Sequence, residues 1–426
     1  MRILLTCIEE PSHLRTMVPL AWGLMAAGHD VRAAGGPGIT TTILEAGIPS
    51  VTVGIPSSAA ELLSMAADQG DSLENELTDW TRPQDTTEDW ETALLRYQVA
   101  VPMAFALYND PMVEDLVDLA RDWRPDLILW ESLTYAGAIA AAASGIPHAR
   151  VNWMHDIYGA MRETFVARLA EQPEEDREDP LREWFESHLH PYGAEFEEHL
   201  VSGLWTFDLI PPSQQFTTSL HRVPVRPLAY TSKAALPLDV PERGVRPRVC
   251  LTAGVSLQET FGVDFLDVET IADALADLDV EIVAAIPPEQ AAAWIHRPAN
   301  VIHAGFVPLN FLLSSCSAVL HHGGFGTWAH ALAAGIPQHI TAICHGDLTI
   351  KGDYLVKSGA GILRHPSHVS PGQLREDVTA LVSDSAYQSA ATALADEVRA
   401  IPSPAEIAAN LAPIVEAYGL TEVPIR

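Results

Sequence analysis

The chain has 426 residues, a formal net charge of −31 and four cysteines. One hydrophobic core seldom supports so long a chain, so we expect two domains of about 200 residues each. Nucleic acids and anionic membrane surfaces are bound through clusters of Lys and Arg, and the sequence contains no such cluster, which argues against both as partners. The longest small apolar run, at 136–147, is shorter than the ~20 residues that a membrane span needs.

The N-terminal sequence and the cysteines indicate a reducing compartment. The apolar run in MRILLTCIEE is too short for the core of a signal peptide, and the sequence then turns acidic. The cysteines lie far apart without a C-x-x-C pair, which favours buried free thiols over a zinc site or a disulfide framework. We therefore expect a cytoplasmic protein.

The first half alternates strands and helices. ILLTC at 3–7 has the length and composition of a buried strand, and apolar residues then recur with helical spacing from Leu14 to Met25. Strands are expected near 30 and 50, with a helix between them that ends at Gly47. This alternation predicts a parallel sheet with helices on its faces, which is a Rossmann-like domain.

The loop after the first strand, IEEPSH, contains no glycine. Its backbone therefore cannot approach a pyrophosphate as the nicotinamide fingerprint demands, so a dehydrogenase is not expected. The loop offers His13 at the carboxyl end of the strand, where open α/β sheets bind ligands. Glu131 similarly follows the strand expected at 126–130. A surface histidine and an N-cap-like acid before the helix at 134–144 are the structural alternatives.

Two segments of the first half are acidic. Residues 68–92 are weakly periodic and resemble an insertion near a substrate cleft. Residues 156–200 are helical, and an apolar stripe runs among their carboxylates. This stripe is either the inner face of an ordinary amphipathic helix or a docking face for a partner protein. The stripe consists of Trp184, Phe185, Leu189 and Phe196.

The second half alternates again and contains the most distinctive stretch, SAVLHHGGFGTWAHALAAGIP at 317–337. A short buried strand leads into paired histidines, a glycine-rich turn and a helix that Thr327 can start. Bare amides at a helix N-terminus bind phosphate oxygens, and His322 adds a donor beside them. The stretch matches neither the P-loop nor G-x-G-x-x-G, and a turn whose glycines serve only packing is the alternative.

These motifs together resemble the nucleotide-sugar-dependent glycosyltransferases of the GT-B fold, α/β proteins with two Rossmann-like domains facing across a cleft. HHGGFGT followed by AAGIPQ is similar to their donor-diphosphate signature. SHLRTMVPLAWGLMAAGH, WRPDLILWESLTYAGAIAAAASGIPHAR and QPEEDREDPLREW resemble the macrolide and anthracycline deoxysugar transferases of antibiotic biosynthesis. The expected division is an acceptor domain at 1–225, a linker at 226–247, a nucleotide-sugar domain at 248–400 and a helix at 401–426 that crosses back to the first domain.

The resemblance implies inverting transfer of a deoxysugar from a nucleoside diphosphate, usually thymidine-linked, to a hydroxyl of a polyketide aglycone, without a metal or cofactor. By position His13 resembles the general base, and a neutral imidazole can take the proton of an attacking hydroxyl. Glu131 takes the place of the acid that orients this base, where relatives more often have Asp.

On the donor side the resemblance assigns His322 to the α-phosphate, and the amides of Gly324, Gly326 and Thr327 to the diphosphate. Phe306 is expected to stack on the base and Val307 to pair with it through its backbone, with plain core packing as the alternative for both. The remaining donor residues are Gly254 and Ser256, in the loop after the first strand of the second domain, and Asp347, which can read a sugar hydroxyl.

The resemblance also implies partners. Close relatives often work with a cytochrome-like auxiliary protein, whose docking is expected within 156–200, and the chain could form a homodimer. Two other function classes remain: a non-catalytic sugar-nucleotide-binding protein that assists another enzyme, and a two-domain sugar-nucleotide epimerase that needs no acceptor pocket.

Overall fold

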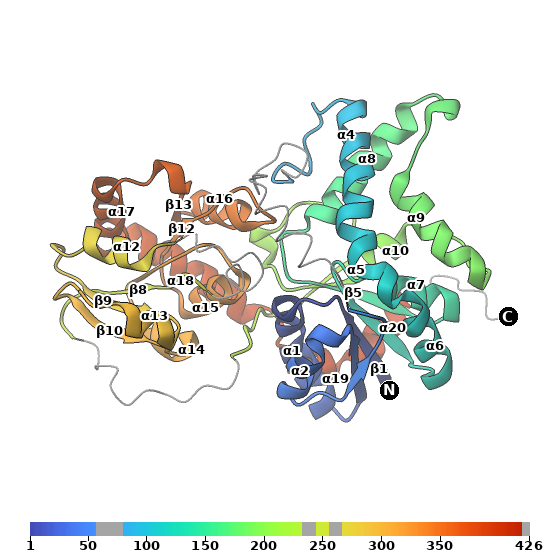
Figure 1. Ribbon diagram of the computed structural model, residues 1–426, viewed down its shortest axis with the longest axis horizontal. Coiled ribbons are helices and arrows are strands. Elements are labelled where there is room, and N and C mark those ends of the chain that lie inside the picture. Colours follow the sequence, from blue (N-terminus) through green and yellow to red (C-terminus); the bar gives the residue numbers. More distant parts are fainter. Residues whose placement is uncertain (57–79, 232–243, 255–265, 420–426) are drawn as a thin grey trace. The chain divides into compact units, whose positions relative to one another are not determined.

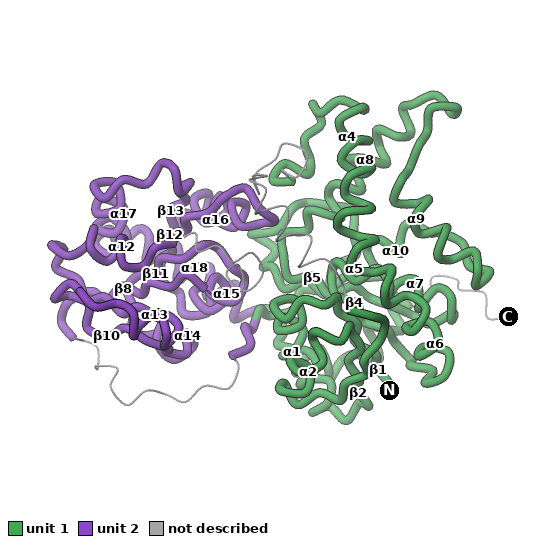
Figure 2. The backbone as a smooth tube through the Cα atoms, in the orientation of Figure 1, with its two compact units in different colours: residues 1–227, 401–426 green, residues 228–400 purple. Residues whose placement is uncertain are grey.

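The computed structural model describes residues 1–56, 80–231, 244–254 and 266–419. The chain forms two compact units, of which the first contains residues 1–227 and 401–426 and the second contains residues 228–400 (Figure 2). Each unit contains a parallel β-sheet covered by helices (Figure 1). The alternation of strands and helices predicted two Rossmann-like sheets, and this prediction is confirmed.

The sheet of the first unit has the order β3-β2-β1-β4-β5-β6-β7 in the described residues, and every neighbouring pair is parallel. The chain proceeds outward from β1 to β3 and then returns to place β4 on the other side of β1. In α/β sheets such a reversal of strand order marks the usual place for a ligand. The strands are β1 (Arg2–Cys7), β2 (Asp30–Gly35), β3 (Ser50–Thr52), β4 (Leu127–Glu131), β5 (His148–Asn152), β6 (Thr206–Asp208) and β7 (Arg222–Pro224).

Helix α6 (Val113–Trp123) shows why the periodic segments form helices. Its buried residues recur every three or four positions, and the acidic residues between them face solvent. The helix ends at Arg124, which adopts a left-handed φ of 50°. The other helices of this unit are α1 (Pro11–Ala26), α2 (Thr40–Glu45), α4 (Trp90–Ala100), α5 (Leu107–Asn109), α7 (Tyr135–Ser144), α8 (Ile157–Glu171), α9 (Pro180–Leu189), α10 (His199–Ser202), α19 (Pro404–Ala409) and α20 (Leu411–Tyr418).

The C-terminal segment packs on the first helix of the chain. The carbonyl oxygen of Pro404 lies 2.6 Å from the place where a Cβ on Gly23 would stand, so only glycine permits this close approach. The backbone N–H of Arg226 donates to the carbonyl of Pro402 over 2.8 Å, and its Nε donates to that of Ile401 over 2.9 Å. The two points where the chain passes between the units are thus bonded to each other within the first unit.

The sheet of the second unit has the order β10-β9-β8-β11-β12-β13, again with parallel neighbours among the described residues. Its central strands β8 and β11 are fully buried, as their apolar sequences require. The strands are β8 (Arg248–Leu251), β9 (Glu281–Ala285), β10 (Val301–Gly305), β11 (Ala318–His321), β12 (Gln338–Thr341) and β13 (Gly361–Arg364). The helices are α12 (Val268–Ala274), α13 (Pro288–Ala293), α14 (Leu309–Leu312), α15 (Phe325–Ala334), α16 (Leu348–Ser358), α17 (Pro371–Ser383) and α18 (Ser385–Ala400).

The structure corrects two local predictions about helix starts. His13 does not lie in a loop, because α1 begins at Pro11 and places His13 in its first turn. Helix α15 begins at Phe325 and not at Thr327, because Gly324 has an extended backbone and its carbonyl already accepts the N–H of Trp328. Strands β6 and β7 and helices α4, α5, α13 and α17 were not predicted.

The apolar stripe of segment 156–200 faces the core of the first unit. Phe185 and Leu189 are fully buried, and Trp184 is 9% exposed. Phe196 packs against the same cluster. The first three of these residues therefore form the inner face of the amphipathic helix α9, Phe196 packs on the same core from the segment after it, and the stripe is not available to a partner.

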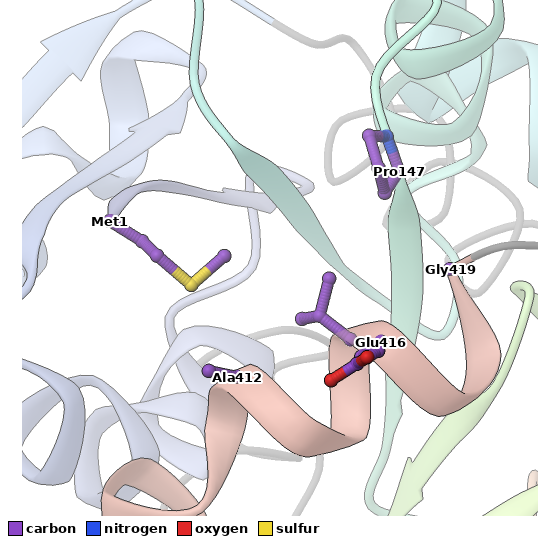
Figure 3. Close-up of a pocket in the computed structure, with 6 residues that line it drawn as sticks. Met1, Pro147, Ala412, Glu416 and Gly419 are labelled. Carbon is purple, nitrogen blue, oxygen red and sulfur yellow. The ribbon is translucent and has the colours of Figure 1, made fainter.

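A shallow pocket of about 340 Å³ opens near the N-terminus of the first unit (Figure 3). Met1 and Pro147, which line it, directly precede β1 and β5, so the pocket lies at the amino ends of the strands. Ala412, Glu416 and Gly419 line it from α20 and the residue that follows this helix. Ligands of a parallel sheet bind at the opposite edge, where the carboxyl ends of the strands lie.

Among the described helices, none combines the length and the hydropathy of a membrane span.

Candidate active site

Three neighbouring strands of the first sheet bring a histidine, a glutamate and a tryptophan together at their carboxyl ends. His13 follows β1, Glu131 ends β4 and Trp153 follows β5. His13 Nδ1 donates to Glu131 Oε1 over 3.0 Å, and Trp153 Nε1 donates to the same oxygen over 2.8 Å. The rings of His13 and Trp153 meet edge to face, with their centroids 4.7 Å apart. The sequence-predicted pair of His13 and Glu131 is thus brought into direct contact.

Glu131 is a fully buried carboxylate whose two oxygens both accept hydrogen bonds. Its Oε2 accepts the backbone N–H of Leu133 and the hydroxyl of Thr134, each over 3.1 Å. Burial alone would raise the pKa of Glu131, but the charge and hydrogen bond of His13, with the other donors, lower it. Glu131 is therefore ionised, and it both contacts His13 and stabilises the turn before α7.

His13 carries the opposite shift. Burial acts to lower its pKa, but the charge and the hydrogen bond of Glu131 outweigh burial and raise the pKa above its ordinary value. Because Nδ1 keeps its proton for Glu131, the neutral ring has its lone pair on Nε2. Nε2 makes no hydrogen bond to the part of the chain that the structure describes, and the side chain is 15% exposed. The arrangement is that of an oriented general base.

Asn109 braces the turn that carries Glu131. Its side-chain amide donates to the carbonyls of Phe105 and Leu133, and its oxygen accepts the N–H of Ala136, each over 2.8 Å. All three bonds are made by a side chain that is completely buried. Sequence reasoning missed Asn109 and Trp153, since neither belongs to a periodic or glycine-rich pattern.

The glycine-rich motif of the second unit forms a strand, a turn and a helix as predicted. The first N–H inside the ladder of α15 is that of Trp328, which donates to Gly324 over 3.1 Å. The N–H groups of Phe325, Gly326 and Thr327 precede this bond and therefore lack an acceptor within the helix. At the positive end of a ten-residue helix, these three amides form a seat for an anion.

His321, the first histidine of the pair, fixes the turn. Its Nδ1 accepts the N–H of Gly323 over 3.1 Å, so its Nε2 carries the proton and donates to Gln338 Oε1 over 2.9 Å. Burial, with the nearby His322, lowers the pKa of His321 to about 3, which keeps the ring neutral. Gly323 has a φ of 94°, a conformation that favours glycine.

His322, the second histidine, fits between two glycines. A Cβ on Gly254 would lie 2.3 Å from its Cε1, and a Cβ on Gly324 would lie 2.7 Å from its Nε2. Burial lowers the pKa of His322 to about 4, with the Ala253 backbone acting in the opposite direction, so the ring is neutral at pH 7. Gly254 and Gly324 are therefore needed to accommodate the imidazole.

The other residues predicted to bind the sugar donor differ in how far they are buried. Phe306 is 45% exposed and free to contact a ligand, so the core-packing alternative is wrong for it, whereas the side chain of Val307 is 4% exposed and packs in the core. Asp347 is buried and forms an ion pair with Lys351, one turn along α16. Sequence reasoning did not single out Lys351. Ser256 lies outside the described residues.

Comparison with known proteins identifies the family. The model of "Erythromycin biosynthesis protein CIII-like, N-terminal domain" matches residues 22–254, and the corresponding C-terminal model matches residues 269–414. The 10-deoxymethynolide desosaminyltransferase of Streptomyces venezuelae is 41% identical over 96% of both chains. The aclacinomycin-T 2-deoxy-L-fucose transferase of Streptomyces galilaeus is 38% identical over 96% of this chain and 94% of its own.

Solved structures agree with this result. The glycosyltransferase VinC, crystallised with dTDP, matches 98% of this chain and 100% of its own with a TM-score of 0.85 and 34% identity. The spinosyn forosaminyltransferase SpnP matches 98% of this chain and 99% of its own with a TM-score of 0.80 and 30% identity. The chain therefore belongs to the erythromycin biosynthesis protein CIII-like family and is a glycosyltransferase of the GT-B fold.

Proposed function

We propose that the protein transfers a deoxysugar, with inversion, from a thymidine diphosphate donor to a hydroxyl of a polyketide aglycone. The observation that carries this proposal is the pair of His13 and Glu131 at the carboxyl edge of the first sheet. A histidine oriented by a buried carboxylate, with its Nε2 unbonded within the described chain, suits removal of a proton from an alcohol. The acceptors of the curated relatives, which include 10-deoxymethynolide and tylactone, support an aglycone as that alcohol.

In this mechanism Nε2 of His13 takes the proton of the acceptor hydroxyl while its oxygen attacks the anomeric carbon of the sugar. The bond between that carbon and the diphosphate oxygen breaks, and the diphosphate leaves from the opposite face, which inverts the anomeric configuration. Glu131 stabilises the imidazolium that forms, because its charge lies 3.0 Å from Nδ1. General-base assistance of this kind contributes about 10²- to 10⁴-fold to the rate.

The second unit is assigned to the leaving group. The amides of Gly326 and Thr327 and the neutral ring of His322 would donate to the diphosphate and stabilise the charge that develops on it. VinC was solved with dTDP, which supports a thymidine nucleotide as the carrier of the sugar. Phe306 is assigned to the base of the nucleotide and Asp347 to a hydroxyl of the sugar. The proposal needs neither a metal nor a cofactor.

Product analysis tests the proposal. The purified chain is incubated with TDP-desosamine, TDP-mycarose or TDP-mycaminose, with and without 10-deoxymethynolide or tylactone, and products are identified by mass spectrometry. We expect a glycoside only when an aglycone is present. An altered sugar in the absence of aglycone would instead indicate an epimerase, and binding of TDP without any conversion would indicate a non-catalytic protein. If the chain alone is inactive, addition of a cytochrome-like auxiliary protein tests the predicted partner.

Replacement of the base separates binding from chemistry. His13→Ala should lower kcat by about 100-fold or more while the Kd for TDP, measured by calorimetry, stays within about twofold. The first unit carries His13 and the second carries the amides of α15, so the two measurements report on different parts of the chain. Full turnover in the His13→Ala variant would remove the base assignment.

A further inference from the structure

A second carboxylate, that of Glu10, lies beside the general base and has no part in the mechanism above. Glu10 is the residue before α1, but its side chain makes no capping bond to that helix. Only 9% of the residue is exposed. A carboxylate with so little contact with water is usually hydrogen-bonded by several donors or paired with a cation.

The hydrogen-bond partners of Glu10 are too few for its burial. Within the described chain its side chain has a single partner, the hydroxyl of Tyr108, which donates to Oε1 over a long 3.4 Å. The other oxygen has none. The neighbouring Glu9 accepts the backbone N–H of Gly38, and Glu131 accepts four donors. One oxygen of Glu10 thus has no donor from the described chain and belongs to the small part of the residue that solvent can reach.

Glu10 lies on the same side of α1 as His13. The residue before a helix and the third residue within it lie side by side, as the reciprocal bonds of a capping box show. The charge of Glu10 contributes to the raised pKa of His13. Burial raises the pKa of Glu10 and the charge of His13 opposes this rise, while the backbone N–H of His13 donates to the carbonyl of Glu10 over 3.1 Å. A ligand at Nε2 of His13 is therefore close to the carboxylate of Glu10.

We propose that Glu10, with Tyr108, binds a second hydroxyl of the aglycone, next to the hydroxyl that His13 deprotonates. This inference rests on the proposed function. It implies that the segment after β1, which carries Glu10, determines which hydroxyl of the aglycone reacts. The ligand hydroxyl donates to the unpaired oxygen of Glu10, and Tyr108 keeps its bond to the other oxygen. A site built to bind a hydroxyl discriminates strongly against an analogue that lacks it, because the buried acceptor is then left unpaired.

Acceptor binding tests this inference. The Kd and KM for 10-deoxymethynolide, tylactone and aklavinone are measured for wild type, Glu10→Gln and Glu10→Ala, with Glu183→Gln as the matched control. Glu183 is an exposed carboxylate of the same unit. Loss of a hydrogen bond to a charged group predicts that Glu10→Ala raises the acceptor Kd by about 10-fold or more. We expect a smaller rise for Glu10→Gln, because its amide oxygen can still accept, and none for the control.

Analogues that each lack one hydroxyl of the bound aglycone then identify the contact. For the analogue without the bound hydroxyl, wild type and Glu10→Ala should have the same acceptor Kd, because the interaction is already lost. An acceptor Kd that Glu10→Ala does not change would overturn the proposal. So would a loss confined to kcat with a shift of the acid limb of the pH profile, because Glu10 would then act only through His13.

Failure of the transferase proposal can be distinguished from failure of the Glu10 proposal. If wild type forms no glycoside, the transferase proposal fails, but the acceptor Kd values still decide the role of Glu10. Folding of the first unit, which carries Glu10, is checked by near-ultraviolet circular dichroism and by the midpoint of urea unfolding, and both should match those of wild type in the Glu10 variants. Tyr108→Phe provides a milder perturbation, because it removes the one donor to Glu10 without removing the carboxylate.

Discussion

Replacement of Glu131 by Gln gives the sharpest test of the base assignment. The carboxylate accepts four hydrogen bonds and offers no donor of its own. In Glu131→Gln one accepting oxygen becomes an NH₂ group. Whichever way the amide is oriented, that group faces either His13 and Trp153 or Leu133 and Thr134, all of which donate at present. The variant therefore sets donor against donor at one of the two positions, and when the NH₂ group faces His13 it also favours the wrong tautomer of that ring.

The magnitude follows from the role of the carboxylate. Loss of the orienting charge should lower kcat/KM for the acceptor by about 10²- to 10⁴-fold. Glu131 also raises the pKa of His13, against the effect of burial, so its neutralisation lowers that pKa. A base works only when it is deprotonated, and activity therefore appears as the pH rises through its pKa. The acid limb of the pH profile of kcat/KM should move to lower pH in the variant.

The assay is glycoside formation between pH 5 and pH 9, with Glu183→Gln as the control for replacement of a carboxylate by an amide. Glu131→Asp should lose less activity than Glu131→Gln, because the charge remains although the side chain is one methylene shorter. A kcat/KM for Glu131→Gln within about threefold of wild type, or an acid limb that does not move, would refute the reasoning.

Three further predictions follow from the geometry. Trp153→Phe removes the N–H donor to the dyad but keeps an aromatic ring, so kcat should fall by about 10-fold with little change in the KM for the donor, as steady-state kinetics would show. Gly324→Ala should displace the ring of His322 and raise the Kd for TDP by about 10-fold, whereas Gly372→Ala, which has room for a Cβ, should leave calorimetric titrations unchanged. Burial lowers the pKa of His148 to about 3 in the folded protein, below its ordinary value of 6.5. Protonation therefore favours the unfolded chain, and the free energy of unfolding should fall by about 1.4 kcal/mol per pH unit as the pH decreases from 6.5 towards 3. His148→Gln should reduce this slope in urea denaturation between pH 6 and pH 5, and an unchanged slope would contradict the assignment.

The sequence predicted the features that depend on periodicity and on glycine. The apolar residues located most strands and helices of both units, because they form a short continuous run in a buried strand and recur every three or four residues in an amphipathic helix. Glycine next to paired histidines located the turn between β11 and α15. Strands β6 and β7, of three residues each, were missed beside the prolines at 211, 212 and 224, whereas β3, which is equally short, was predicted from the run SVTVG.

The site was predicted only in part, because its supporting contacts are made between residues far apart in the sequence. His13 and Glu131 each follow a predicted strand, and they were paired through the resemblance to glycosyltransferases. Trp153 was missed, since an isolated tryptophan after a strand has no distinctive local pattern. The ion pair of Asp347 with Lys351 was also missed, although the spacing of four residues on a helix could have suggested it.

The division of the chain has a consequence for its synthesis. The second unit is continuous in sequence, whereas the first is completed only by residues 401–426, whose helix α19 packs on α1. On the ribosome the second unit can therefore reach its final fold while the first unit still lacks its last helices. Removal of the C-terminal segment should destabilise the part of the chain that was made first, near Gly23, and leave the part that immediately precedes the cut intact.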